Sequence, residues 1–319
     1  MDTLKSRLNY FNIAFFAIWL WIWWFTIATQ KIEEAFELTT NFWSYLTYFT
    51  LWLFIIILLW YISKFYLNFQ EVKNDYFHPV KSNFFSWAGK ILLILSIAFL
   101  ETNPDIALYF WIVWSLIQWV FTIIILRRWI LKEIDINIMN PLWFLPIVWN
   151  LLIPIAWVEL GFPEISWFFF SIGIIMWIVL FTIVIYRIIF HNPLPEKFYP
   201  TLFILIAPPA IALISYSALN GQEFNQFWKI LYYFALFLFI ILASISNILS
   251  RINFYMSWWA YSFPIAAFTI STILFYQQTS IEFFKYLSIF LYVLLIIIII
   301  ILVYKTCKAA KNHQLCIQE

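Results

Sequence analysis

The stretch NPLPEKFYPTLFILIAPPAIALISYSAL (192–219) decides the fold. It begins as a polar loop and continues as an apolar helix with Pro208 and Pro209 in its middle. Proline has no backbone N–H, so this pair frees the carbonyls of Ile204 and Leu205 four residues earlier. In lipid, a freed carbonyl must be satisfied by protein or by water in a cavity. The stretch therefore predicts a helix that lines the interior of a membrane protein; the alternative is a packing kink inside a helical bundle.

The composition places the chain among integral membrane proteins. Of 319 residues, 65% are hydrophobic, 24% aromatic and 11% charged, and the mean hydropathy is +0.90. A soluble domain has roughly 25% charged residues, so we expect little of this chain outside a bilayer. The net charge of +2 includes no dense basic patch, which argues against a nucleic-acid partner. We expect no cofactor and no metal, because Cys307, His313 and Cys316 are scattered through a short tail.

Ten apolar runs of about 20 residues are long enough to cross a membrane. The first follows Lys5 and Arg7 and resembles a signal peptide, but its length and tryptophan content favour an uncleaved helix. The expected helices are 11–29, 43–64, 83–101, 106–127, 142–160, 165–190, 201–219, 225–248, 258–278 and 283–304. They form a single transmembrane domain over 1–319, with a short C-terminal tail at 305–319.

The charges in the loops orient these helices. With ten helices, fourteen basic residues fall on the side that holds both termini and three on the other. This asymmetry predicts cytoplasmic termini by the positive-inside rule. The three are Lys31, Lys229 and Lys285, and the fourteen are Lys5, Arg7, Lys64, Lys73, Lys81, Arg127, Arg128, Lys132, Arg187, Lys197, Arg251, Lys305, Lys308 and Lys311.

The expected helices repeat as pairs. The third, fifth, seventh and ninth begin near residues 83, 142, 201 and 258, at nearly constant spacing. Prolines inside the expected spans occur only in odd-numbered helices, at Pro146, Pro154, Pro208, Pro209 and Pro264. We therefore expect an all-α membrane protein of five helical hairpins with quasi-five-fold symmetry. Kinked odd helices surround a central pore, and straight even helices lie around them. The tenth, with the run LLIIIIIILV (294–303), is apolar all round, as a lipid-facing helix would be.

Four segments resemble a known family, the tellurite-resistance/dicarboxylate transporters: HPVKSNFF (78–85), NPLWFLPIVWNLLIPIAW (140–157), YPTLFILIAPPAIALISY (199–216) and SWWAYSFPIAAF (257–268). That family includes bacterial tellurite-resistance protein A, yeast malate and sulfite carriers, and the slow-type anion channels of plants. The resemblance extends from about Tyr10 to Tyr304. It implies ten helices in a hairpin ring, a homotrimer with one pore in each protomer, and a gating phenylalanine at Phe263.

Two segments depart from the family pattern. Family members usually have glycines in the first helix, where this chain has FFAIWLWIWWF (15–25), and the whole chain contains only four glycines. The third helix carries Gly89 where a proline is common, with Lys90 beside it. Bulky side chains on the inner helices are expected to narrow the passage.

Two residues are candidates for a direct role in the pore. Phe263 precedes Pro264, so a kink there would aim its ring into the passage and block it sterically and by dewetting; the alternative is a ring packed in the core. Lys90 lies about 10 Å inside the third helix. It either attracts anions in the pore or extends its ammonium back to the interface.

Further candidates are polar residues on odd helices, which could donate hydrogen bonds to a passing anion. In membrane proteins such residues more often bond a neighbouring helix. The pore-lining candidates are Asn150, Ser262 and Thr269, and Ser215 and Ser217 belong to the same class.

The sequence favours an anion channel or transporter of the cell (inner) membrane, in contact with lipid and moving chloride, nitrate, sulfite or a dicarboxylate. Alternatives within transport are a proton-coupled C4-dicarboxylate carrier and a sulfite or tellurite exporter. No enzyme is expected, because Walker A, HExxH and GxSxG motifs are absent. A non-conducting assembly subunit or an embedded transferase is a remote alternative. A transferase would need clustered acids and histidines, whereas His78, His191 and His313 are scattered.

Overall fold

A computed structural model of the chain describes residues 15–77, 92–93, 95–96, 103–156, 161–249 and 251–312. Every regular element in these ranges is a helix. Within them, seven helices are long and apolar enough to cross a membrane. The prediction of an all-helical membrane protein is therefore confirmed.

The helices expected on the outside are continuous α-helices. Their most apolar windows are only 17–33% buried, because most side chains point away from the protein. Two of them have capped starts: the Asn103 and Asn225 side chains accept N–H groups from the first turns of α6 and α10. The five helices are α3 (Phe42–Leu67), α6 (Pro104–Leu131), α8 (Pro163–Phe190), α10 (Gln226–Ser244) and α13 (Glu282–Lys311), and the short α11 (Ser246–Leu249) follows α10.

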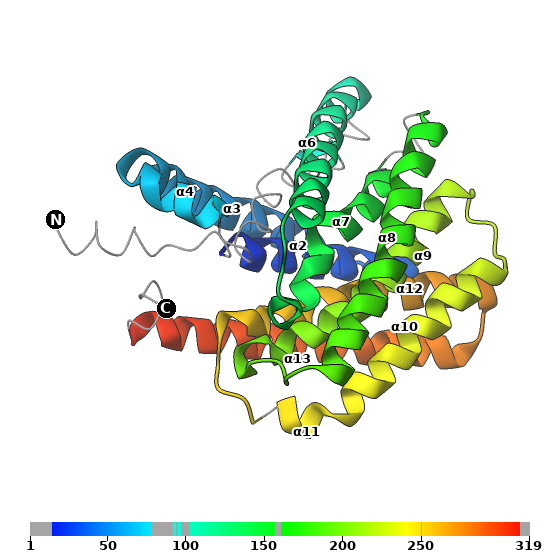
Figure 1. The fold of residues 1–319 in the computed structure, drawn as a ribbon. Coiled ribbons are helices and arrows are strands. Elements are labelled where there is room, and N and C mark those ends of the chain that lie inside the picture. The colour runs from blue at the N-terminus through cyan, green and yellow to red at the C-terminus, as the bar shows by residue number, and fades with distance from the viewer. Residues whose placement is uncertain are drawn as a thin grey trace.

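The segments expected on the inside are buried. The most apolar parts of Glu196–Leu219 and Met256–Thr279 are 67% and 89% buried. In the N-terminal helix, every residue from Phe16 to Phe25 is buried. In Figure 1, α12 packs against α2 and α13. The inner segments are α2 (Phe15–Ala35), η3 (Pro141–Phe144) with α7 (Leu145–Val148) and η4 (Trp149–Ala156), η6 (Glu196–Ile206) with α9 (Ala207–Leu219), and η7 (Met256–Tyr261) with α12 (Ser262–Thr279).

The kinked α-helix expected at 201–219 is instead a 3₁₀-helix, η6, continued directly by α9. Pro208 and Pro209 lie in the first turn of α9, where backbone N–H groups have no partner within the α-helix. The carbonyl of Ile204, which the sequence left without a donor, accepts the N–H of Ala207 in a tighter 3₁₀ bond. The prolines therefore mark a change of helix type and not a break inside one α-helix.

The same correction applies to the expected helices 142–160 and 258–278. The first is largely 3₁₀, with Pro146 in the four-residue α7 and Pro154 inside η4. The second begins as η7 and becomes α12, whose first turn contains Pro264. Three inner segments thus change helix type next to a proline.

The expected third helix, 83–101, lies largely outside the described residues. Only residues 92–93 and 95–96 of it are described, and they are helical. Gly89 and Lys90 are outside the described ranges, so the role of Lys90 stays a prediction.

Close packing joins the outer helix α8 to the inner segment η4. A Cβ atom on Gly173 would lie 2.6 Å from Cγ of Leu151, whose side chain is fully buried. Glycine is therefore required for this approach, because real Cβ contacts are longer.

A buried ion pair fixes the short helix α4 (Phe69–Phe77) against the end of α3. Lys64 Nζ lies 2.6 Å from an Asp75 carboxylate oxygen, and both side chains are almost inaccessible to solvent. A charge removed from water in this way needs its partner, because loss of one member leaves an uncompensated buried charge. The pair therefore specifies how the chain turns back after α3.

Candidate pore constriction

Phe263 lies where three inner segments meet. It is the second residue of α12 and is 2% exposed. Its ring centroid is 5.2 Å from that of Trp24 on α2 and 5.1 Å from that of Trp149 at the start of η4. Both distances fall within the range of about 4.5–7 Å that is typical of interacting aromatic rings. One phenylalanine ring therefore joins elements that are far apart in the sequence.

Phe263 also borders a small cavity between the inner segments. The cavity volume is about 10 Å³, which is at the lower limit for holding one water molecule. All nine lining residues are apolar, so the space offers no group that could replace the hydration of an ion. They are Phe144, Leu145, Val148, Trp149, Ile204, Ala207, Pro208, Ile211 and Phe263.

Among the five prolines singled out from the sequence, Pro208 lines this cavity. The others lie on the same inner segments, where their effect is on the backbone. The carbonyl of Pro146 accepts hydrogen bonds from Gln118 Nε2 at 2.8 Å and from Thr122 Oγ1 at 3.4 Å, both on α6. Polar residues on an outer helix thus satisfy backbone groups of an irregular inner segment, as required away from water.

The predicted pore-lining residues have hydrogen bonds within the protein. Asn150 Nδ2 donates to Thr122 Oγ1 on α6 at 3.0 Å, so this side chain is directed to the outer layer. The hydroxyls of Ser262 and Thr269 each donate to a backbone carbonyl of the preceding turn at 2.8 Å. None of the three is among the residues that line the small cavity. Their contact with a passing anion stays a prediction.

Sequence reasoning did not identify the two tryptophans that contact Phe263. The aromatic stretch 15–25 predicted a narrower passage, but nothing in it distinguished Trp24 from its neighbours. Trp149 lies inside the segment 140–157, which resembles the family, but no local feature distinguishes it from the other aromatic residues there. Only the packing of α2 and η4 around α12 brings these two rings to the third.

A buried arginine was also missed, because the sequence counted Arg187 only as a loop charge. Its side chain, in the last turn of α8, is 1% exposed. Its Nη2 donates to the carbonyl of Asn137 at 3.2 Å, while Nε and Nη1 have no hydrogen-bond partner in the part of the chain described here. Asn137 lies in the short 3₁₀-helix η2 (Ile136–Ile138), four residues before Pro141, where η3 begins. A poorly compensated positive charge therefore lies near one end of a segment that borders the cavity.

The family match and the related proteins all indicate an anion channel or transporter family. Residues 10–307 match the voltage-dependent anion channel family (SLAC1). The S-type anion channel SLAH3 of Arabidopsis thaliana is 28% identical over 79% of this chain and 40% of its own length. The uncharacterized transporter MJ0762 of Methanocaldococcus jannaschii is 25% identical over 98% of both chains. The tellurite resistance protein TehA homolog of Haemophilus influenzae is 26% identical over 72% and 70%.

The coverage differs between relatives. The chain spans about half the length of the plant channels that it matches, 40% of SLAH3 and 52% of SLAH2, whereas it spans nearly all of the archaeal transporter. The family match, in contrast, runs from the N-terminal side of α2 into the last turns of α13. With its whole membrane-spanning part matched in this way, the chain belongs to the voltage-dependent anion channel family.

Proposed function

We propose that the protein passes a small anion across the membrane through a passage between the inner segments, and that Phe263 closes this passage. The observation that carries the proposal is the position of its ring, between Trp24 and Trp149 at a cavity of about 10 Å³. An apolar constriction of this size is dry, and a dry constriction is a barrier to any hydrated ion. Conduction then requires the ring to leave its two neighbours.

Positive charge supports an anion as the transported species. Arg187 is buried with two N–H groups unpartnered among the described residues, close to the start of the segment formed by η3, α7 and η4. Charge in a low-dielectric setting is weakly screened and raises the local concentration of the opposite ion. We assign Arg187 an attracting role and keep Lys90 as a second candidate for the same role.

We further propose that the inner segments form a five-membered ring. Among the described segments α12 contacts α2 and α9, and α9 contacts η4. The expected helix 83–101 would occupy the fifth place. In this proposal the pore lies within one protomer and the protomers form a trimer, as the family resemblance implied.

We also propose that the protein lies in the inner membrane with both of its termini on the cytoplasmic side. The test of this orientation is labelling of single cysteines by an impermeant reagent, in a background without Cys307 and Cys316. A cysteine at Glu164 should label in intact cells and one at Glu196 should not. The opposite pattern would contradict the assigned orientation.

The test of the function is anion flux from liposomes that contain the purified protein. Chloride, nitrate, sulfite and malate would be loaded in turn, with and without a pH gradient, and empty liposomes would give the background. We expect downhill flux of at least one anion without a proton gradient. If flux requires a proton gradient, the protein is a coupled carrier and not a channel. The absence of flux for every anion would refute the proposal.

A further inference from the structure

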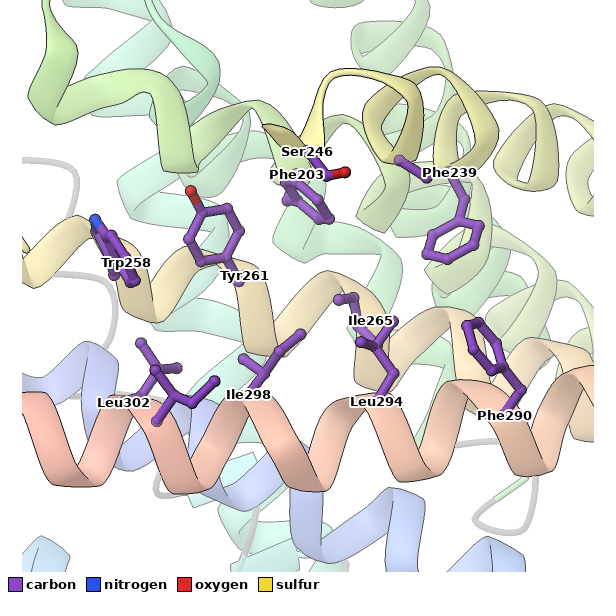
Figure 2. Close-up of a pocket in the computed structure, with 12 residues that line it drawn as sticks. Phe203, Phe239, Ser246, Trp258, Tyr261, Ile265, Phe290, Leu294, Ile298 and Leu302 are labelled. Carbon is purple, nitrogen blue, oxygen red and sulfur yellow. The ribbon is translucent and has the colours of Figure 1, made fainter. Parts of the chain in front are cut away.

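A second and larger hollow lies on the outer side of α12. It is an open groove of about 410 Å³ between α10 and α13, and its floor is formed by residues of η6 and η7 and by Ile265 of α12 (Figure 2). Figure 2 shows Trp258 and Leu302 at one end of the groove and Phe239 and Phe290 at the other. The lining is almost entirely apolar: Phe203, Phe239, Ala243, Ser246, Trp258, Tyr261, Ile265, Phe290, Leu294, Ile298, Ile301 and Leu302.

The length of the groove matches the depth of one leaflet. Phe290 and Leu302 both line it and lie on α13. Twelve residues separate them, which is about 18 Å along an α-helix. Half of a hydrocarbon core of ~30 Å is similar in length. A groove that runs along a membrane-spanning helix over this distance is parallel to the acyl chains of the surrounding lipid.

A positive charge lies at one end of the groove. Lys305 Nζ is 4.7 Å from the ring centroid of Trp258, which lines the groove. Lys305 is also one helical turn beyond Ile301, another lining residue, and so lies on the same face of α13. A tryptophan beside a lysine at the end of a spanning helix is typical of the headgroup level of a membrane. The groove therefore begins at a cationic headgroup position and continues into the apolar core.

We propose that this groove is a binding site for an anionic membrane phospholipid, with one acyl chain in the groove and the phosphate beside Lys305. Two observations favour a lipid over a helix of a second protein copy. The groove has a lysine at one end, beside Trp258, and an almost entirely apolar lining along the rest of its length. An anionic headgroup followed by an acyl chain has the same order of charge and apolar length.

The site lies directly behind the constriction. Ile265 lines the groove and Phe263, two residues earlier on α12, lines the small cavity on the other side. Likewise Phe203 lines the groove and its neighbour Ile204 lines the cavity. A lipid chain in the groove would therefore pack against the backs of two segments that form the constriction.

The test is the retention of lipid by the purified protein, measured by native mass spectrometry. Phosphatidylglycerol and phosphatidylcholine are the two probes, added at equal concentration after delipidation. Ala243→Trp fills the groove from α10, and Ile300→Trp is the matched control, because Ile300 lies on α13 outside the groove and is 62% exposed. Lys305→Gln removes the charge and leaves the apolar groove.

We expect the wild-type protein and the Ile300→Trp control to retain one phosphatidylglycerol per chain in preference to phosphatidylcholine. Ala243→Trp should weaken retention about tenfold or more, because even two methylene groups displaced from the groove account for that factor. Lys305→Gln should abolish the preference between the two lipids. If Ala243→Trp does not fold, Ser246→Phe fills the groove from α11 and takes its place. Equal retention by the filled and control variants would refute the site, and a changed oligomeric state with unchanged retention would assign the groove to a second copy.

Discussion

Replacement of Phe263 by alanine separates the two roles that a buried phenylalanine could have. The ring makes two aromatic contacts, with Trp24 at 5.2 Å and with Trp149 at 5.1 Å. Each such contact contributes about 0.5–1.5 kcal/mol beyond the burial of area, so moving the ring away from both costs about 1–3 kcal/mol. If this movement opens the passage, the ring lowers the open population by a factor of roughly 5–150. Phe263→Ala should therefore raise anion flux by a similar factor.

If Phe263 only fills the core, the same substitution should lower anion flux instead of raising it. A ring that only fills the core leaves a cavity when it is removed, which costs about 3–5 kcal/mol of unfolding free energy. Expression and flux would then fall together. The assay is anion efflux from liposomes at equal protein content, together with the thermal unfolding midpoint of the same preparation.

A matched control lies on the same helix. Phe268 is fully buried in α12 and also makes two ring contacts, with Tyr232 at 5.8 Å and Phe239 at 5.5 Å, but it does not line the cavity. Phe268→Ala should lower the unfolding midpoint without raising flux. A folded Phe263→Ala protein whose flux equals or falls below that of the wild type would refute the closure of the passage by this ring.

Three other substitutions test the constriction and the packing around it. Trp24→Ala removes one of the two rings that hold Phe263, so flux should rise by roughly 2- to 13-fold, less than for the loss of Phe263 itself; unchanged efflux would exclude Trp24 from the constriction. Gly173→Ala places a methyl group against Leu151 and should lower the free energy of unfolding by about 1–3 kcal/mol, measured against Ser171→Ala on the exposed face of α8. Pro264→Ala supplies an N–H that can bond the carbonyl of Ala260. Because of this additional hydrogen bond, the variant should have a higher unfolding midpoint and a flux lower by roughly 2- to 13-fold. A rise in flux would contradict this prediction.

The positions of most membrane spans could be predicted, because an apolar run of the right length has few other uses in a chain this hydrophobic. The expected helix 165–190 is observed as α8, Pro163–Phe190, and the expected end at 219 is the last residue of α9. The expected helix 225–248 is shorter, since α10 ends at Ser244 and α11 follows, but the other four outer helices extend further than the apolar runs. For example, α13 continues to Lys311, since polar residues beyond the bilayer still continue the backbone hydrogen bonds.

The helix type of the inner segments could not be predicted, because 3₁₀- and α-helices have the same apolar composition. The type is decided by which partners satisfy the backbone, and these come from other elements. Gln118 on α6 bonds the carbonyl of Pro146, and the indole N–H of Trp111 bonds that of Ile153 in η4. Such pairs are separated by 28 and 42 residues, beyond the reach of any local pattern.

Only part of the candidate site could be predicted from the sequence. Phe263 was identified from the adjacent proline and the family resemblance, and the structure places it at the small cavity. Trp24 and Trp149 could not be distinguished among 20 tryptophans, because a ring contact between three segments depends on their mutual rotation. The aromatic stretch 15–25 predicted a narrower passage, which stays a prediction, and it did not distinguish Trp24 from its neighbours.

The change of helix type offers a physical route by which Phe263 could leave its place, and it connects the prolines to the constriction. A 3₁₀-helix advances 120° and about 2.0 Å per residue, whereas an α-helix advances 100° and about 1.5 Å. Conversion of one three-residue turn of η7 would therefore rotate the side chains of α12 relative to η7 by about 60° and shift them by about 1.5 Å. Pro264 donates no backbone hydrogen bond in either helix type, so no bond is lost at that position when the type changes. A proline beside the blocking ring thus lowers the cost of rotating it, and this is why Pro264→Ala is expected to hold the passage closed.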